Sequence, residues 1–186
     1  MIEKLREALA ERQIQRINDS KIKISAVLVP IFLKAGQYHL LFIQRTERVR
    51  EHKGQISFPG GAYEKADGLL LNTALREAEE EIGLTPVDVN VLGELDDVPT
   101  ASSNYVISPF VGAIPYPYKF KLDRWETEEF IEVPIASLLD KDCYSESTVK
   151  LKGLEIDTGF YKCGDKIIWG ATSKVLKQFL EIYTGL

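Results

Sequence analysis

The stretch between Asp67 and Gly83 constrains the fold of this chain more than any other part of it. Its apolar residues recur at helical spacing and fall on one face of an α-helix, namely Leu71, Ala74, Leu75, Ala78 and Ile82. Asp67 is a residue type that caps helix N-termini, and Gly83 is one that ends helices. We therefore expect an amphipathic helix that packs its apolar face against another layer of structure.

Strands are expected on both sides of this helix, because short runs rich in β-branched and aromatic residues lie between turn residues. They cover residues 21–33, 38–44, 56–58, 87–95, 105–114 and 130–133, with two or three more between 148 and 169. Residues 34–37 predict a hairpin turn, and Pro30 predicts an edge position or a bulge for the first strand. Further helical segments are expected at 2–17, 134–139 and 170–183. The mixture indicates an α/β sandwich with a mixed β-sheet.

The length of 186 residues and the hydrophobic content of 45% fit one globular domain. We expect an N-terminal helical segment over residues 1–20, followed by a single domain over residues 21–186. The N-terminal helix either packs on that domain, where it could cover a site, or forms a partner surface such as a homodimer interface. The sequence favours neither.

The formal net charge of −5 argues against general binding to nucleic acid, because phosphate backbones require a basic surface. The charged N-terminus has no apolar signal core, and no segment approaches the roughly 18 apolar residues of a membrane span. Cys143 and Cys163 are interpreted as free thiols in a reducing compartment, with a disulfide as the alternative. We expect a cytoplasmic protein with no membrane partner.

The predicted helix carries glutamates near its C-terminal end, and three of them share a face. At about 100° per residue, Glu77, Glu80 and Glu81 lie together beside the apolar stripe, whereas Glu79 lies on its far side. Like charges at this spacing cost roughly 0.2–0.5 kcal/mol per pair, and the helix dipole disfavours acids in the last turn. Residues that oppose local preferences indicate a functional site, and carboxylates are ligands of hard divalent cations. The alternative is a solvated acidic surface.

Residues that flank the glutamates favour the functional interpretation. Arg76 lies four residues before Glu80 and is expected to pair with it. The upstream pair Gly60-Gly61 is expected to let the backbone approach a metal ion or phosphates closely, with an ordinary turn as the alternative.

The sequence from Phe58 to Leu84 resembles the Nudix box, whose pattern is G-x5-E-x7-R-E-U-x-E-E-x-G-U with U aliphatic. Its second half, REAEEEIGL at residues 76–84, matches in full. The first half departs, because five residues after Gly61 lead to Asp67 in place of glutamate, and eight residues, not seven, then lead to Arg76. Both departures resemble the coenzyme A pyrophosphatase branch of the Nudix hydrolases and leave the role of Asp67 open.

A second motif resembles the same branch, whose signature is L-L-T-x-R-[SA]-x3-R-x3-G-x3-F-P-G-G. Arg45, Arg50, Gly54 and the FPGG run at residues 58–61 hold its spacing, while Thr46 replaces Ser or Ala and the run LFIQ before Arg45 matches imperfectly. The runs GELDD at residues 93–97 and IWGAT at residues 168–172 are also similar to this branch. The resemblance spans residues 38–172, most of the chain.

This resemblance implies a Nudix-type α/β/α sandwich and a metal-dependent hydrolase that splits the pyrophosphate of coenzyme A or acyl-CoA into 3′,5′-ADP and (acyl-)4′-phosphopantetheine. It assigns Mg²⁺ or Mn²⁺ to Glu77, Glu80 and Glu81, with Arg76 as the orienting partner. These four residues form the predicted catalytic group.

Substrate binding is expected at Arg45, Arg50, Gly60 and Gly61. Coenzyme A carries a 3′-phosphate beside its pyrophosphate, and the planar guanidinium of arginine suits phosphate. The alternative for the basic segment is a solvated loop.

The general base is less constrained, because Nudix enzymes take it from the box or from a later loop. The box glutamates are our first choice. The later candidates are Glu126 and Glu129, which lie three residues apart in a stretch that could equally be a solvated loop.

Three other functions stay open. The chain could hydrolyse another nucleoside diphosphate derivative, such as ADP-ribose or a dinucleoside polyphosphate. It could be a catalytically inactive binding module with a Nudix fold. It could also carry a structural helix that binds metal weakly without catalysis.

Overall fold

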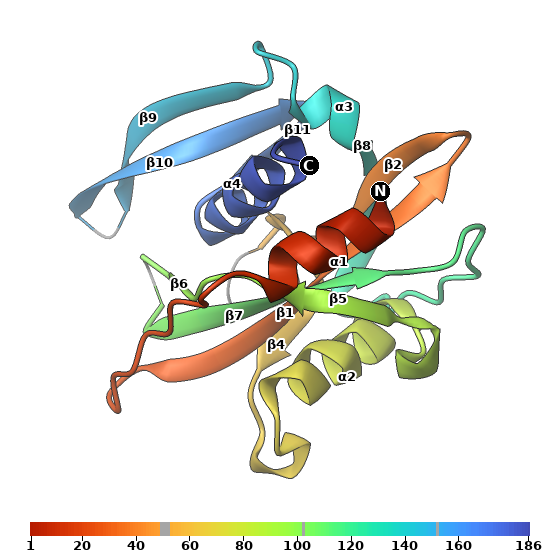
Figure 1. Cartoon of the computed structure of the whole chain (residues 1–186). Coiled ribbons are helices and arrows are strands. Elements are labelled where there is room, and N and C mark those ends of the chain that lie inside the picture. The colour runs from red at the N-terminus through yellow and green to blue at the C-terminus, as the bar shows by residue number, and fades with distance from the viewer. Residues whose placement is uncertain (49–52, 102, 152) are drawn as a thin grey trace.

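The computed structural model describes residues 1–48, 53–101, 103–151 and 153–186, and Figure 1 shows how their elements are arranged. The α-helices in these ranges are α1 (Ile2–Ala10), α2 (Leu70–Ile82), α3 (Ile135–Leu138) and α4 (Ala171–Thr184). Short 3₁₀ turns cover Lys65–Asp67 and Pro86–Asp88.

The strands form a larger mixed sheet and a smaller antiparallel one. The larger sheet contains β1 (Lys23–Lys34), β2 (Gln37–Arg45), β3 (Ile56–Ser57), β4 (Gly60–Ala62), β5 (Asn90–Glu94), β6 (Val98–Pro99), β7 (Tyr105–Ala113) and β8 (Thr127–Pro134). Its main order is β3-β2-β1-β7-β5, in which β1 and β7 are parallel, while β4, β6 and β8 pair with β1, β7 and β2. The smaller sheet has the order β11-β10-β9, from β9 (Tyr144–Leu151), β10 (Leu154–Cys163) and β11 (Lys166–Trp169).

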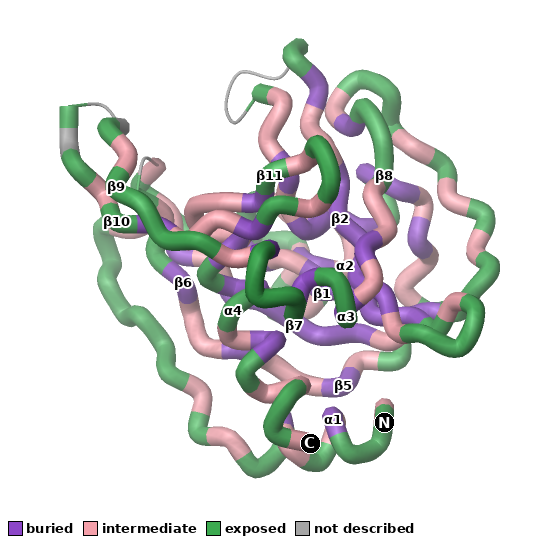
Figure 2. Tube along the Cα trace, turned by 90° about the horizontal axis from the view of Figure 1, so that it is seen from above, coloured by how far each residue is buried: buried purple, intermediate pink, exposed green. Residues whose placement is uncertain are grey.

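Structure covers both faces of the larger sheet, so the predicted α/β/α sandwich is confirmed. Figure 1 shows α2 on one side and α1 and α4 on the other. Side chains on β1 alternate between two cores: Leu28 packs in the core beneath α2, and Val29 packs in the core shared with α1 and α4. Seen from above in Figure 2, the buried chain runs along β1, β2 and β7.

The predicted hairpin between residues 34 and 37 is confirmed. Lys34 pairs with Gln37 at the end of antiparallel β1 and β2, and Ala35 and Gly36 both have positive φ, as a two-residue hairpin turn of type I′ requires. The strands after residue 144 and the closing helix are also present. Cys143 and Cys163 are free thiols, in agreement with the interpretation of the sequence.

The prediction of an edge position for the first strand is wrong. β1 lies between β2 and β7 inside the larger sheet. Pro30 is tolerated because β1 pairs with β4 over Ser25–Val27 and with β2 over Ile31–Lys34, so the proline lies between these two antiparallel pairings.

The predicted helix over residues 2–17 ends at Ala10. The following arm is held by the acidic GELDD run: Arg12 pairs with Asp96 at 2.7 Å, and the backbone N–H groups of Gln15 and Ile17 donate to Asp96 and Asp97, each at 3.0 Å. These bonds satisfy backbone groups that a longer helix would have used within itself. The GELDD run therefore anchors the N-terminal arm.

Two other boundaries differ from expectation. Asp67 is not the N-cap of α2, because Leu69 occupies that position and Asp67 closes the preceding 3₁₀ turn. The strand expected to begin at residue 87 begins at Asn90, since Pro86–Asp88 forms a 3₁₀ turn with proline at its start. At the other end of α2, Gly83 is the left-handed cap that the sequence predicted, with φ 68°.

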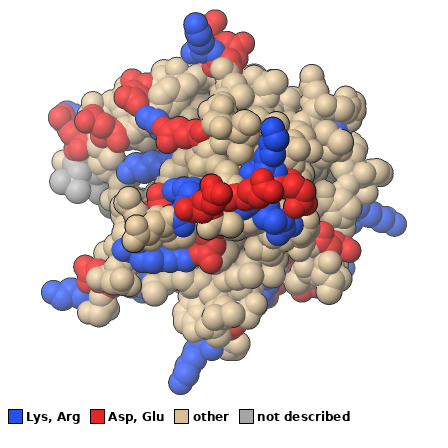
Figure 3. Space-filling model, viewed as in Figure 1, with Lys and Arg blue, Asp and Glu red and all other residues tan. Residues whose placement is uncertain are grey.

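Acidic and basic side chains lie interspersed over the face of the molecule seen in Figure 3. The described residues therefore present no continuous basic track on this face, of the kind that nucleic-acid binding needs. None of the described helices is long and apolar enough to cross a membrane.

Candidate active site

Arg76 organises the C-terminal half of α2. Its Nε and Nη2 donate to the two oxygens of Asp67 at 2.8 and 3.2 Å, and its Nη1 donates to Glu77 at 2.9 Å and to Glu80 at 3.1 Å. Nη2 also reaches the carbonyl oxygen of Ala62 in β4 at 3.1 Å. The predicted Arg76–Glu80 pair is therefore present. The paired guanidinium holds the pKa of Asp67 well below its usual range, so Asp67 serves as the anchor of Arg76.

The Gly60-Gly61 pair brings backbone against the glutamates of α2. Gly60 donates its N–H to Glu81 Oε2 at 3.0 Å. A Cβ on Gly61 would overlap the Glu77 carboxylate, and a Cβ on Gly60 would overlap the Ala26 carbonyl oxygen of β1. Both glycines belong to strand β4, so the alternative of an ordinary turn is wrong. The backbone approaches the Glu77 and Glu81 carboxylates closely, while its approach to a metal ion or phosphates stays a prediction.

Glu81 lies in the interior, with only 3% of its side chain exposed. Its Oε1 accepts from Arg45 Nη1 at 3.1 Å, and Arg45 Nη2 also donates to Glu126 Oε2 at 3.4 Å. Arg45 therefore joins a helix carboxylate to a loop carboxylate. Burial raises the pKa of Glu81 to about 8, against the opposing attraction of Arg45 and the Gly60 N–H.

Glu77 is the second poorly hydrated carboxylate of α2. Burial raises its pKa above the ordinary value, although Arg76 opposes the shift, and the charges of Glu80 and Glu126 add to it. The charge of Glu126 raises the pKa of Glu81 as well. Glu77, Glu81 and Glu126 therefore lie close enough to repel one another, and Arg45 and Arg76 neutralise this negative charge only in part.

This carboxylate group fits a hard divalent cation. Carboxylate oxygens are the ligands that Mg²⁺ and Mn²⁺ prefer, and a cation would relieve the repulsion between desolvated acids. Among the described residues, no three acids, histidines or cysteines lie close enough together to form a ready metal site. Arginines hold the acids: Arg76 contacts Glu77 and Glu80, and Arg45 contacts Glu81.

The remaining predicted residues separate into two groups. Glu80, with 60% of its side chain exposed, faces Arg76, while Glu79 is exposed to solvent. Glu126 is brought to the site by Arg45, whereas Glu129 lies on β8 and pairs with Lys166 at 2.6 Å. Arg50 lies outside the described residues.

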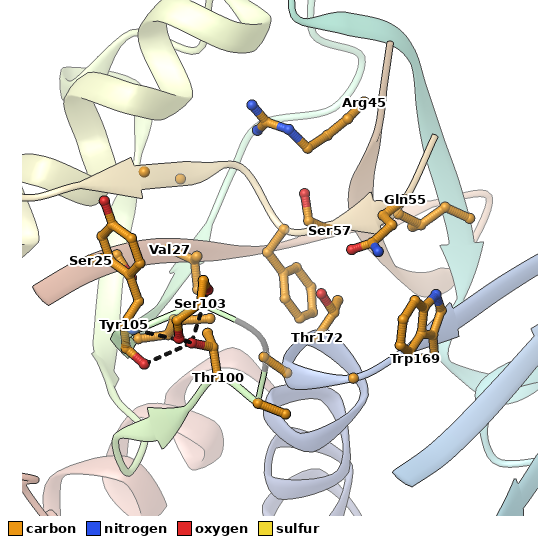
Figure 4. Close-up of a pocket in the computed structure, with 18 of the residues that line it drawn as sticks. Ser25, Val27, Arg45, Gln55, Ser57, Thr100, Ser103, Tyr105, Trp169 and Thr172 are labelled. Atoms are coloured by element: carbon orange, nitrogen blue, oxygen red, sulfur yellow. Dashed lines mark hydrogen bonds between the residues drawn. The ribbon is translucent and has the colours of Figure 1, made fainter. Parts of the chain in front are cut away.

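A cavity of about 710 Å³ opens beside these residues, and Figure 4 shows its lining. This volume falls within the range of roughly 300–1,000 Å³ that is typical of small-molecule sites. Arg45, Glu126 and the β4 residues Gly60 and Gly61 line one part of it. The rest of the lining combines polar side chains, such as Gln55 and Tyr105, with apolar ones, such as Val149, Ile156 and Trp169.

The sequence did not reveal these other parts of the cavity wall. Trp169 and Thr172 belong to the IWGAT run, which stood out as a motif but carried no assigned role. Trp125 and Trp169, which are all the tryptophans of the chain, both line the cavity. Two tryptophans far apart in sequence can be placed around one cavity only when the fold is known.

A buried carboxylate helix, a glycine strand packed against it and an adjoining cavity define the class of protein. The family model of the NUDIX domain matches residues 23–143. The chain therefore belongs to the Nudix family. It is accordingly a hydrolase of phosphoanhydride bonds, in a family whose members generally use divalent metal ions.

Relatives with assigned names agree with this family. The uncharacterized Nudix hydrolase NudL of Photorhabdus laumondii is 33% identical over 167 residues, covering 90% of this chain and 88% of that protein. The uncharacterized Nudix hydrolase NudL of Yersinia pestis is 32% identical over 157 residues, covering 84% and 78%.

Solved structures share the fold at low sequence identity. A MutT/nudix family protein from Enterococcus faecalis has a TM-score of 0.60 at 15% identity, covering 94% of this chain and 66% of that one. The NUDIX domain of Shewanella oneidensis NrtR, solved with ADP ribose, has a TM-score of 0.52 at 19% identity, covering 72% and 84%. These likenesses establish the fold.

Proposed function

We propose that this protein hydrolyses the pyrophosphate bond of coenzyme A or an acyl-CoA, releasing 3′,5′-ADP and (acyl-)4′-phosphopantetheine. One observation carries the proposal: Arg45, Gly60 and Gly61 of the coenzyme A-type motif line the same cavity, next to the glutamate helix. The residues that suggested the substrate and those that suggested the chemistry therefore meet at one place.

In the proposed site, Glu77, Glu80 and Glu81 hold Mg²⁺ or Mn²⁺, which supplies charge neutralisation at the phosphates. Arg76 keeps these carboxylates in place through its contacts with Asp67, Glu77 and Glu80. Glycine at position 61 leaves the space beside the Glu77 carboxylate free of a side chain, and Gly60 lets β4 pack closely on β1.

Arg45 is proposed to bind a substrate phosphate from the cavity wall. In the structure its guanidinium contacts Glu81 and Glu126. Binding of a cation by the carboxylates would free this guanidinium for an incoming phosphate. Arg50 is proposed for the second anionic group of coenzyme A on the motif alone, since it lies outside the described residues.

The general base that deprotonates the attacking water is assigned to the box glutamates, with Glu126 as the loop alternative. Glu126 lines the cavity and contacts Arg45, which supports it over Glu129 with its Lys166 partner. Glu126→Gln should lower kcat by about 100-fold or more if Glu126 is the base, because general-base catalysis contributes on that order.

The cellular setting is proposed from the sequence. Free thiols at Cys143 and Cys163 suit the reducing cytoplasm. A homodimer stays a prediction, which sedimentation at several protein concentrations would test.

Product analysis by liquid chromatography tests the proposed reaction. Purified protein is incubated with coenzyme A and, separately, with ADP-ribose, each in Mg²⁺, Mn²⁺ or EDTA. Metal-dependent release of 3′,5′-ADP, with ADP-ribose spared, is the expected result. Cleavage of ADP-ribose alone would retain the glutamate chemistry and discard the coenzyme A assignment. Cleavage of neither compound would favour another substrate or a non-catalytic binding module.

A further inference from the structure

We propose that the smaller sheet binds the non-nucleotide arm of the substrate, with Trp169 at the centre of an apolar subsite. The arm is a flexible amide chain that ends in a thiol or an acyl thioester. This inference rests on the proposed function. It also names the smaller sheet as the part of the protein that distinguishes substrates by their arm.

The subsite is built by chain that follows the matched family domain. The NUDIX domain match ends at residue 143, whereas the cavity is also lined by Val149, Ile156 and Thr158 of the smaller sheet, and by Trp169. The beginning of α4 continues this wall through Ala171. Catalysis thus comes from the family domain, while the C-terminal segment shapes the rest of the cavity.

The two faces of the smaller sheet have different surroundings. Tyr161 and Ile168 are buried in the core that contains α4. Val149 pairs directly with Ile156, and both line the cavity from the opposite face. The sheet therefore fixes its position through one face and presents the other to a ligand.

Trp169 is held in place although its side chain is only partly buried. It pairs with Phe160 across β10 and β11, and the two rings stack with centroids 6.5 Å apart and planes at 17°. Trp169 also lines the cavity, so part of its apolar surface is left facing the space that a ligand would fill. Such a fixed aromatic surface gains free energy when an apolar group covers it.

The wall around Trp169 is largely apolar, with the polar side chains of Gln55 and Thr172 on the same side, and this composition suits a flexible amide chain. Val149, Ile156 and Ala171 offer no hydrogen bonds from their side chains, and the Thr158 hydroxyl already accepts from the Gly170 N–H at 3.2 Å.

Polar side chains line both sides of the cavity, and Gln55 and Thr172 lie on the side of Trp169. Figure 4 shows Thr100, Ser103 and Tyr105 grouped across the cavity from Trp169, with Arg45 at the top of the view. With the phosphates beside Arg45 and β4, the nucleotide half is oriented to the Tyr105 side and the arm to the Trp169 side.

Isothermal titration calorimetry tests this inference by measuring the affinity of each of the two expected products in Mg²⁺. The test does not depend on catalytic activity. The arm ligand is 4′-phosphopantetheine, and the nucleotide ligand is 3′,5′-ADP. Trp169→Ala should weaken 4′-phosphopantetheine binding by about tenfold or more and change 3′,5′-ADP binding by less than about twofold. Ile167→Ala is the matched control, because Ile167 lies on the same strand, is exposed and does not line the cavity in the described chain.

A second variant guards against a folding defect in Trp169→Ala. Val149→Phe keeps Trp169 and narrows the same subsite from β9, so it should also weaken 4′-phosphopantetheine selectively. In Trp125→Phe, Trp169 becomes the sole tryptophan, and its emission should respond to 4′-phosphopantetheine and not to 3′,5′-ADP.

Equal losses for both ligands, or no loss for either, would overturn the subsite while leaving the proposed reaction intact if the wild-type protein cleaves coenzyme A. A wild-type protein that neither cleaves coenzyme A nor binds 4′-phosphopantetheine would overturn both.

Discussion

At the scale of single residues, Glu81 has two properties that oppose each other. Its carboxylate is almost fully buried, yet its two oxygens accept from Arg45 and from the Gly60 N–H. Burial disfavours the charged form more strongly than these partners favour it, and the pKa rises to about 8. In the absence of metal the site is therefore under electrostatic stress that depends on pH.

The metal-free protein should lose stability as pH rises from about 4.5 to about 8. In this interval folded Glu81 retains a proton that the unfolded chain, with its ordinary pKa of 4.5, has released, so the folded state binds more protons. Glu81→Gln removes this titration and should stabilise the protein at pH 8 by roughly 1–3 kcal/mol, with little effect at pH 5. Urea unfolding in EDTA at both pH values measures this. Identical pH profiles for the two proteins would show that Glu81 is not the group responsible.

Activity should separate the glutamates by face. Glu77→Gln and Glu81→Gln are expected to lower kcat by about 100-fold or more, because both carboxylates belong to the proposed metal site. Glu79→Gln should change kcat by less than about twofold, since Glu79 is exposed on the other side of the helix. Steady-state kinetics with coenzyme A and Mg²⁺ compare the variants, and circular dichroism checks their fold. Similar losses in all three would contradict the helix-face assignment.

At the scale of elements, β4 packs between β1 and α2, and its adjacent glycines Gly60 and Gly61 contact different neighbours. Gly60 packs against the backbone of β1, which cannot give way, whereas Gly61 faces the end of the Glu77 side chain, which can. The same substitution should therefore affect stability at one position and chemistry at the next.

Gly60→Ala should destabilise the protein by about 1–3 kcal/mol, because the added methyl group overlaps backbone atoms of β1. Gly61→Ala should destabilise it less and reduce kcat more, because the methyl group displaces the Glu77 carboxylate. Paired urea unfolding and kinetic measurements decide the point. The reverse ranking, with Gly61→Ala the less stable and the more active protein, would contradict this packing.

The N-terminal arm is an element whose contribution should be structural. Arg12 and Arg16 pair with Asp96 and Asp97, and no described residue before Ser25 lines the cavity. The double change Arg12→Ala and Arg16→Ala should lower stability by about 1–2 kcal/mol, since the pairs are partly buried, and leave kcat within about twofold. Thermal unfolding and turnover of coenzyme A test this together. A large loss of kcat in a folded variant would mean that the arm acts on the site.

At the scale of the whole molecule, metal binding and folding should be linked. A cation that binds the folded carboxylate site but not the unfolded chain raises the unfolding temperature, and it binds better as the carboxylates lose their protons. Mg²⁺ or Mn²⁺ should therefore raise the melting temperature more at pH 8 than at pH 6. Glu81→Gln should reduce this stabilisation, and Glu79→Gln should retain it. Scanning calorimetry with and without EDTA measures the shifts, and equal shifts in both variants would place the metal elsewhere.

The sequence by itself determined the features that arise from local pattern. The apolar spacing on α2 predicted which face of the helix is buried, whereas the separation of Glu79 from the other glutamates stays a prediction. Turn residues between β1 and β2 predicted their hairpin. These features follow from backbone periodicity and turn chemistry, which act over a few residues.

Only the tertiary structure decided which distant residues meet. Arg45 contacts Glu81 and Glu126, which lie 36 and 81 positions away in the sequence. Pro30 suggested an edge strand, yet β1 is an inner strand. Its proline lies between the stretch that pairs with β4 and the stretch that pairs with β2. The cavity wall around Trp169 likewise depends on how the smaller sheet packs on α4. Contacts of this kind arise when side chains from separate elements share a core or a site, and no local pattern records which elements those are.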